Sequence, residues 1–437
     1  MKTFHRILPA AALAALAAIL PAAAETAAPE AAIPAESSVG RTSVRELMDG
    51  YLAEKGWTEG WNARADGPGF FVSCGTGVIQ ADPSARTYVD SRVNAFDKAM
   101  LDAEAKMAEF LATRIRTSVV SEYAEGAFAG NDAAESDEAS VVSKLRRLLH
   151  AKLDKALRDE GVDPGTADAA ARERAAAKSI ATEAFARTIR SCARASVCGM
   201  QAACTFEGIP ASGKGEIGVV SVWSPKLQAM AHSLQTGAAL PAGVAKRPIA
   251  QQIPQDAKTL VSTFGIQQKL DENGRLVLVA FGQAGAVSDS AMAAGAAEEK
   301  ARQRAIAAIR EFAGRTVAVA SDMASVETVE EFENAAEEYT DASAFRRRAA
   351  AVADEMKIAG IATVKRWNAV HPVSGGKVYG VVATWSPASA ARAAAARRAM
   401  ETAPGARPVA VPSPVPAPVR RGDSMSGRGA SADDDAM

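Results

Sequence analysis

The stretch Gly208–Val220, GIPASGKGEIGVV, resembles the phosphate-binding loop of nucleotide hydrolases. Gly213 and Lys214 follow Gly208 at the spacing of that loop, in which backbone N–H groups and the lysine hold the phosphates. Gly215, however, stands where the loop needs a Ser or Thr hydroxyl for magnesium. Such a loop must also open a helix, whereas Lys214 leads into EIGVVSVW, whose residues predict a strand. We therefore expect a hairpin turn here, without a nucleotide or other cofactor.

The four cysteines are the next candidates for chemistry: Cys74, Cys192, Cys198 and Cys204. An even number of cysteines in an exported chain indicates disulfides first. We expect Cys74 to pair with Cys204, since both fall on predicted strands, and Cys192 to pair with Cys198. Zinc is the alternative, but the spacing of six residues differs from the two to four that are typical between paired zinc thiolates. We therefore predict disulfides and no metal site.

Histidines and carboxylates form no recognisable catalytic set in the sequence. His150, His232 and His371 fall in a charged helix, near a linker and at a hairpin turn, which predicts solvated or capping roles. The acidic run VETVEEFENAAEEYTD from Val326 is typical of a solvated helix face. We therefore expect a protein that is not an enzyme. The alternative is an exported hydrolase acting on an envelope polymer, with carboxylates from two domains meeting at their interface.

Four tryptophans are candidates for contact with a ligand. Trp223 and Trp385 each end a predicted strand before Ser-Pro, a position that favours closing the edge of a core. Trp57 and Trp61, in KGWTEGW, have no matching pair elsewhere in the chain. They are the better candidates for an exposed binding patch, with core packing as the alternative.

An internal duplication positions these residues. IGVVSVWSP, from Ile217, matches YGVVATWSP, from Tyr379, at six of nine positions. KAMLDAEAKMAEFL, from Lys98, matches KARQRAIAAIREFA, from Lys300. GFFVSCGTG and GMQAACTFEG likewise resemble RLVLVAFGQAG and GIATVKRWNA, in the same order. One folding unit therefore occurs twice.

Each copy reads as an extended run, a long Ala-rich helix, further helical sequence and two strands joined by a turn. In the second copy, the alternation of residues 315–326 predicts an additional strand. The sequence thus predicts an α+β fold with two homologous domains, each a small, mostly antiparallel sheet packed against Ala-rich helices. The predicted order is a signal peptide (1–24), a disordered linker (25–42), repeat domain 1 (43–232), a linker (233–248), repeat domain 2 (249–398) and a disordered Pro/Ala-rich tail (399–437).

The first copy carries an insert at about residues 131–170. Its apolar residues recur at helical spacing, which predicts an amphipathic helix ended by Gly161 and Pro164, then a second helix from Thr166. The helix residues on the apolar face are Val142, Leu145, Leu149, Leu153 and Ala156. We expect this stripe to cap its own domain. Binding of a partner or a membrane surface is the alternative.

The N-terminus predicts export. Lys2 and Arg6 precede an apolar run and Ala22-Ala23-Ala24, as in a signal peptide cleaved after Ala24. We expect a periplasmic or secreted protein without a transmembrane segment. The formal net charge of −1 gives no electrostatic reason to expect a nucleic-acid partner. The predicted partner is an unknown envelope protein or polymer, and homo-oligomerisation stays open.

The second copy also resembles a known kind of domain. The order LVLVAFGQAGAV, AAEEKARQRAIAAIREFAG and RTVAVASDMASVETVEEF is similar to small envelope domains of Lpp-type outer-membrane lipoproteins of Helicobacter and of the flagellar assembly protein T N-terminus. The resemblance covers about residues 276–384 and, more faintly, 70–223. It implies a compact α/β domain used for assembly or binding at the cell envelope, without catalysis. The chain lacks the acylated cysteine of the lipoproteins.

Overall fold

The computed structural model describes residues 43–64, 67–125, 141–180, 197–208, 214–236, 247–325 and 358–402, with residue 351 and short pieces between 182 and 194. The predicted signal peptide, the N-terminal linker, most of the central linker and most of the C-terminal tail lie outside these residues. Among the described residues, no helix combines the length and apolar character that crossing a membrane requires.

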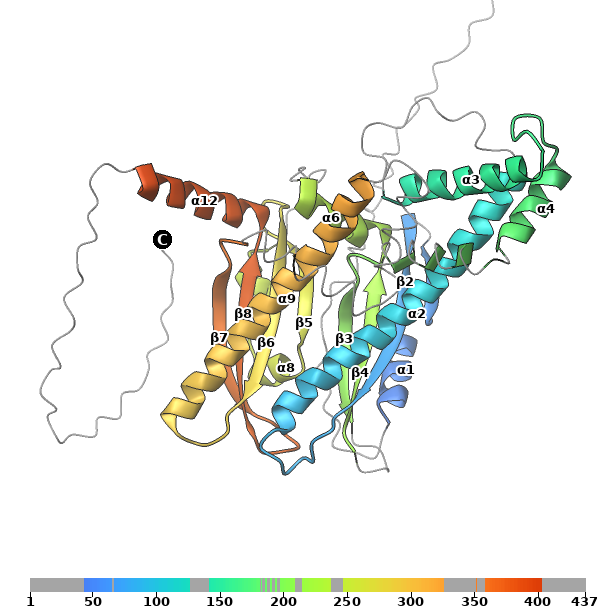
Figure 1. Ribbon diagram of the computed structural model, residues 1–437. Helices are drawn as coiled ribbons and strands as arrows, with labels where there is room; N and C mark the ends of the chain where they lie inside the picture. Colours follow the sequence, from blue (N-terminus) through green and yellow to red (C-terminus); the bar gives the residue numbers. More distant parts are fainter. Residues whose placement is uncertain are drawn as a thin grey trace, which may run out of the picture. The chain divides into compact units, whose positions relative to one another are not determined.

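Two similar sets of elements follow each other along the chain (Figure 1). The first set is α1 (Val44–Lys55), β1 (Gly60–Arg64), β2 (Gly67–Val78), α2 (Tyr88–Glu125), α3 (Val141–Asp159), α4 (Ala169–Ile180), β3 (Gln201–Gly208), β4 (Glu216–Trp223) and α6 (Pro225–Thr236). The second set is α7 (Ile249–Gln252), α8 (Ala257–Val261), β5 (Gly265–Leu270), β6 (Leu276–Gly285), α9 (Ala291–Ser325), β7 (Ala362–Val370), β8 (Lys377–Trp385) and α12 (Pro387–Thr402). We call these sets repeat 1 and repeat 2.

Each repeat contains one four-stranded antiparallel sheet, with strand orders β1-β2-β4-β3 and β5-β6-β8-β7. The registers agree, since Phe71 lies opposite Trp223 in repeat 1 and Leu278 lies opposite Trp385 in repeat 2. Both sheets belong to one compact unit, 1–393, while the end of α12 falls in a second unit. The predicted α+β class, with two regions built around antiparallel sheets, is confirmed.

The long helices α2 and α9 pack directly on the second strand of their sheets. Gly75 in β2 leaves no room for a Cβ atom, because the carbonyl oxygen of Ala99 in α2 already occupies that space. Gly282 in β6 meets the carbonyl oxygen of Ala301 in α9 in the same way. Glycine on the strand and alanine on the helix thus permit backbone-to-backbone contact, which explains the Ala-rich helices.

The WSP segments end a strand and start a helix in both repeats. Trp223 and Trp385 are buried, and their indole N–H groups donate to the carbonyl oxygens of Cys198 (3.1 Å) and Ala359 (3.0 Å). The serines that follow cap helices α6 and α12, since their hydroxyls accept the N–H groups of Leu227 and Ser389 (both 3.1 Å). Proline then occupies the first helical position, where its missing N–H has no cost. Both tryptophans therefore lie in the core at the ends of their strands.

The insert helices pack on their own repeat. Leu149 and Leu153 of α3 are fully buried in a cluster with Val119 and Tyr123 of α2 and Ala175 of α4. The predicted capping of the domain is confirmed, although Leu157, and not Ala156, ends the buried stripe.

One predicted element is wrong. Residues 315–325 belong to α9, which runs without a break to Ser325, so the predicted strand at 315–326 does not form there. The alternation of small residues in RTVAVASDMAS is compatible with a helix as well as a strand. The Thr316 hydroxyl donates to the carbonyl oxygen of Phe312 (2.9 Å), a hydrogen bond that threonine commonly makes within helices.

The edge strands β1 and β5 are too short and polar for the sequence pattern to indicate them.

Candidate functional site

A cavity of about 670 Å³ lies between the long helices of the two repeats, α2 and α9. Its floor is formed where β3 and β5 begin. Most of the lining is apolar, including Phe96, Met100, Ala105, Met200, Ile306 and Ala307. A cavity of this size with a mostly apolar wall and a few polar groups is typical of small-molecule sites.

Ion pairs join α2 to α9 both outside the cavity and in its wall. Near the start of α2, Asp90 accepts hydrogen bonds from Lys300 and Arg304, each at 2.7 Å. Farther along, Glu104 accepts from Arg315 at 2.8 Å. The cavity is lined by α2 from Phe96 to Ala108 and by α9 from Gln303 to Thr316, spans that correspond to about 18–20 Å at a rise of ~1.5 Å per residue. The cavity is therefore elongated along the helices.

Arg315 joins two carboxylates from different repeats at one end of the cavity. Its other terminal nitrogen, Nη2, lies 2.6 Å from Glu311, beside the contact with Glu104. Burial alone would lower the pKa of Arg315, but the negative charges of Glu104 and Glu311 outweigh it and raise the pKa above its ordinary value. Both carboxylates are thus engaged by a permanently charged guanidinium, which gives them the role of an ionic tie.

The strands under the cavity meet edge to edge without forming one sheet. The backbone N–H of Gln268 in β5 donates to the side chain of Gln201 in β3 (2.8 Å), and the Gln268 side chain donates to the carbonyl oxygen of Gly199 (3.0 Å). Gly265 adopts a φ of +74°, and a side chain there would collide with Phe96. At this junction, hydrogen bonds from glutamine side chains therefore join β3 to β5 in place of backbone hydrogen bonds between the strands.

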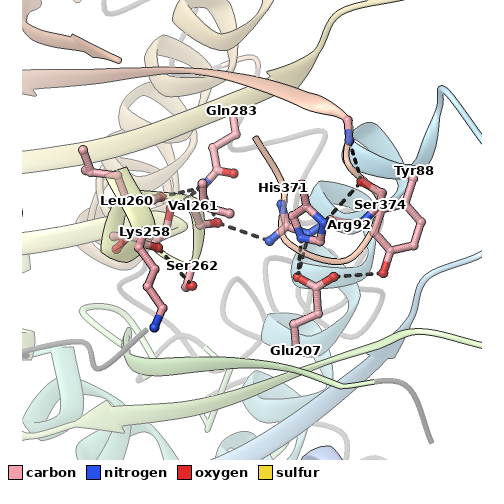
Figure 2. Close-up of polar contacts among 12 residues, drawn as sticks. Tyr88, Arg92, Glu207, Lys258, Leu260, Val261, Ser262, Gln283, His371 and Ser374 are labelled. Atoms are coloured by element: carbon pink, nitrogen blue, oxygen red, sulfur yellow. Dashed lines mark hydrogen bonds and ion pairs between the residues drawn. The ribbon is translucent and has the colours of Figure 1, made fainter. Parts of the chain in front are cut away.

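A buried polar cluster ties the repeats together at a second place (Figure 2). Arg92 of α2 donates to Glu207 of β3 at 2.7 Å, and both side chains are at least 93% buried, with exposed fractions of 1% and 7%. Tyr88 donates its hydroxyl to the other carboxylate oxygen at 2.9 Å. From repeat 2, His371 reaches Glu207 with Nε2 at 3.1 Å. We call Tyr88, Arg92, Glu207 and His371 the junction cluster.

The hydrogen bonds around His371 define its protonation. Nδ1 accepts the backbone N–H of Ser374 at 3.2 Å, so Nε2 carries the proton that is donated to Glu207. Burial lowers the pKa of His371, and Arg92 adds to that effect, so the ring is neutral near pH 7. Burial would raise the pKa of Glu207, but Arg92 and His371 lower it to about 2. The cluster therefore contains one cation, one anion and a neutral ring.

These pKa shifts predict the direction of a pH effect on stability. Both groups have folded pKa values below their unfolded ones, so the unfolded chain binds more protons as the pH falls, and stability is lost. The loss should begin below about pH 6.5 through His371 and continue below about pH 4.3 through Glu207. Urea unfolding of His371→Gln should show a flatter pH dependence than the parent between about pH 7 and pH 5. Equal slopes in the two proteins would contradict the assignment of a neutral, buried His371.

The junction cluster is closed to solvent, which makes it a structural tie and not a reaction centre. The Arg92 guanidinium also donates to the carbonyl oxygen of Val261 at 3.2 Å, so the cluster extends to α8 (Figure 2). Within the part of the chain that the structure describes, Arg92 Nη1 has no partner. The sequence patterns did not single out Tyr88, Arg92 or Glu207, although Glu207 is the one charged residue in the otherwise uncharged strand QAACTFEG. The solvated role predicted for His371 is wrong, since its side chain is buried.

The cysteine pairings predicted from sequence are wrong. Cys74, Cys198 and Cys204 form no disulfide in the described part of the chain, and Cys192 lies outside that part. Cys74 and Cys204 lie on opposite sides of β4, each opposite Val220. Two strand spacings of ~4.8 Å separate them, which exceeds the reach of a disulfide. Burial raises the pKa of the Cys74 and Cys198 thiols to about 12, so neither is a reactive thiolate near neutral pH.

The candidate binding aromatics Trp57 and Trp61 are half-buried and pack within repeat 1. Trp57 contacts Phe70 edge to face, with ring centroids 5.2 Å apart. Trp61 stacks on Phe110 at 6.5 Å, and the Arg114 guanidinium lies 4.5 Å from the Trp61 ring centroid. The packing alternative therefore describes both residues, and neither lines the cavity.

The remaining candidates are also placed. Lys214 is exposed and precedes β4, and Gly208 ends β3, so the predicted hairpin is confirmed and Lys214 does not open a helix. His150 is buried in the insert and packs on Tyr123 with centroids 5.5 Å apart, which overturns its predicted solvated role. In the described ranges, no group of three His, Cys, Asp or Glu side chains could hold a metal ion.

Comparison with known proteins gives a family match for part of the chain. Residues 139–236, from α3 to α6, match a family model described as a domain of unknown function, DUF6844. A crystal structure of the hypothetical protein FTT1539c from Francisella tularensis is similar at 20% sequence identity and a TM-score of 0.47, covering 80% of this chain and 93% of that one. No curated protein matches the sequence significantly.

Proposed function

We propose that this chain is an exported, non-enzymatic binding module of the bacterial cell envelope, and that it binds its ligand in the cavity between α2 and α9. The signal-peptide pattern at residues 1–24 supports export. The resemblance of repeat 2 to envelope assembly domains supports the location and the absence of catalysis.

The observation that carries this proposal is the shape and chemistry of the cavity. It is elongated, mostly apolar and lined from both repeats, so a ligand inside it would contact α2 and α9 at once. Burial of apolar ligand surface there supplies binding free energy of about 25 cal/mol per Å². The ion pairs between α2 and α9 hold the helices at a fixed separation, which preorganises the site.

The polar groups around the cavity favour binding over hydrolysis. A general acid or base needs a carboxyl group that is free to exchange a proton with substrate. Among the three described carboxylates that line the cavity, Glu104 and Glu311 are instead bonded to Arg315, and Asp97 has a partner of its own. A hydrolase with its site between the two repeats would also bring carboxylates from both repeats together. Cleavage of an envelope polymer by the purified protein would therefore overturn this proposal.

Filling the cavity should abolish binding without unfolding the protein. Ala105 in α2 and Ala307 in α9 are exposed to the cavity, so Ala105→Trp or Ala307→Trp places a large ring in it. We expect the uncharged fluorescent probe phenylnaphthylamine to bind the mature parent protein saturably, and each variant to bind at least about tenfold more weakly.

The matched control is Ala296→Trp, an exposed position on α9 that does not line the cavity. It should bind the probe like the parent, and all four proteins should have similar unfolding midpoints. Equal probe affinity in the parent, the two filled variants and the control would exclude the cavity as the binding site.

A further inference from the structure

The two ends of the cavity differ in their charged side chains. Along α9, the lining residues Gln303, Ile306, Ala307 and Ala308 are uncharged, whereas Arg310, Glu311 and Arg315 follow toward the other end. Glu104 of α2 is bound to Arg315 there, and Arg194 and Asp97 of the lining each have a partner of their own. We call the part of the cavity at Arg310 and Arg315 the arginine end.

Both arginines at the arginine end, Arg310 and Arg315, have donors that no described residue uses. Arg310 is exposed at the cavity and has no hydrogen bond or ion pair within the described part of the chain. The Nε atom of Arg315 is buried and likewise has no partner among described residues. A buried N–H without an acceptor is costly, so an anionic group bound here would satisfy it.

The wall that leads away from the arginine end is mostly apolar. Phe96, Met100, Ile266 and Ile306 face this part of the cavity from α2, β5 and α9. A polar chain, such as an extended peptide, would leave its backbone N–H and C=O groups unpaired along this wall. An alkyl chain has no such groups, and each buried methylene adds favourable transfer free energy.

From these contacts we propose that the cavity binds a free single-chain amphiphile with an anionic head group, such as a fatty acid. The head group lies against Arg310 and Arg315, and the chain runs between α2 and α9 toward Gln303 and Phe96. This inference rests on the proposed function, because it requires that the cavity is the binding site.

Displacement of phenylnaphthylamine by ligands of equal chain length tests the head group. We expect dodecanoate to displace the probe at about a tenfold lower concentration than dodecanol or dodecyltrimethylammonium, since a charge-assisted hydrogen bond is worth about one decade of affinity or more. Arg310→Gln should weaken dodecanoate about tenfold and leave dodecanol unchanged.

The matched control is Arg302→Gln on the same helix, whose partner is the exposed Glu299 and which does not line the cavity. It should leave all three affinities unchanged. If the probe binds but dodecanoate and dodecanol compete equally well, the anionic head group is wrong and the proposed cavity site stands. If the probe binding does not respond to Ala307→Trp, both proposals fail.

A bilayer surface is the other source of the same anionic chemistry. Sedimentation with phosphatidylglycerol vesicles distinguishes it, because a single-chain site inside the cavity needs no bilayer. Co-sedimentation that Arg310→Gln abolishes, without displacement of the probe by dodecanoate, would overturn the proposal. Displacement by monomeric dodecanoate in the absence of vesicles supports it.

Discussion

Replacing Gly282 by alanine should destabilise the folded protein by about 3 kcal/mol or more. The new Cβ atom would coincide with the carbonyl oxygen of Ala301 and press on the backbone nitrogen of Ala305. Both obstacles are backbone atoms of α9, so no side chain can rotate away, and the whole helix must move off the sheet. Chemical denaturation followed by circular dichroism measures the effect.

Two further alanine variants bracket this prediction. Gly75→Ala makes the equivalent collision with Ala99 in repeat 1, so it should be destabilising to a similar degree. Gly50 lies inside α1 with no atom within 4 Å of an added Cβ, so Gly50→Ala should stabilise by about 0.5–1 kcal/mol through helix propensity. A stable Gly282→Ala protein would show that α9 does not lie against β6 as described.

Removing the carboxylate of Glu207 should cost about 3–5 kcal/mol, because the charge of Arg92 would remain buried without a counter-ion. Arg92 is 1% exposed, and its only carboxylate partner among the described residues is Glu207. Tyr88 and His371 would lose their acceptor as well. Urea unfolding of Glu207→Ala against the parent protein at neutral pH measures the loss.

The control separates a buried ion pair from an exposed one. Asp49→Ala breaks a pair with Arg45 on the surface of α1, where both side chains are about half exposed, and should change stability by less than about 0.5 kcal/mol. The double variant Arg92→Met/Glu207→Leu removes both charges and should recover much of the stability lost in Glu207→Ala. No recovery would show that the loss arises from packing and not from the unpaired charge.

The structure explains why the two copies differ at their third strands. Every residue of β3 is buried, since β5 of repeat 2 lies beside its outer edge. The equivalent strand β7 is mostly exposed at the edge of its sheet. Cys204 of β3 accordingly corresponds to Lys365 of β7, and charged residues on an edge strand oppose unwanted pairing with other chains. The duplication was visible in the sequence. The sequence did not show which of the two equivalent strands, β3 or β7, would be covered by the other repeat.

The sequence alone determined the local elements and their repetition. These local elements are the alternating strands, the Ala-rich helices, the hairpin at Lys214 and the two WSP segments. Each depends on residues that are close together in the sequence, so the pattern of residue types along the chain is enough to predict it. The sequence also held an unused signal, because Ser-Pro after each strand marks a helix start that the WSP segments do form.

The tertiary structure alone decided which distant residues meet. Glu207 and His371 are 164 residues apart, and Asp90 and Arg304 are 214 apart, yet each pair bonds across the two repeats. Periodicity places Cys74 and Cys204 on strands, but it does not give the order of the strands in the sheet. In the structure β4 lies between their two strands, and the two cysteines lie on opposite sides of Val220. Local patterns specify which face of an element is apolar, whereas contacts between elements depend on how whole surfaces fit together, and the cavity exists only where two such surfaces leave a gap.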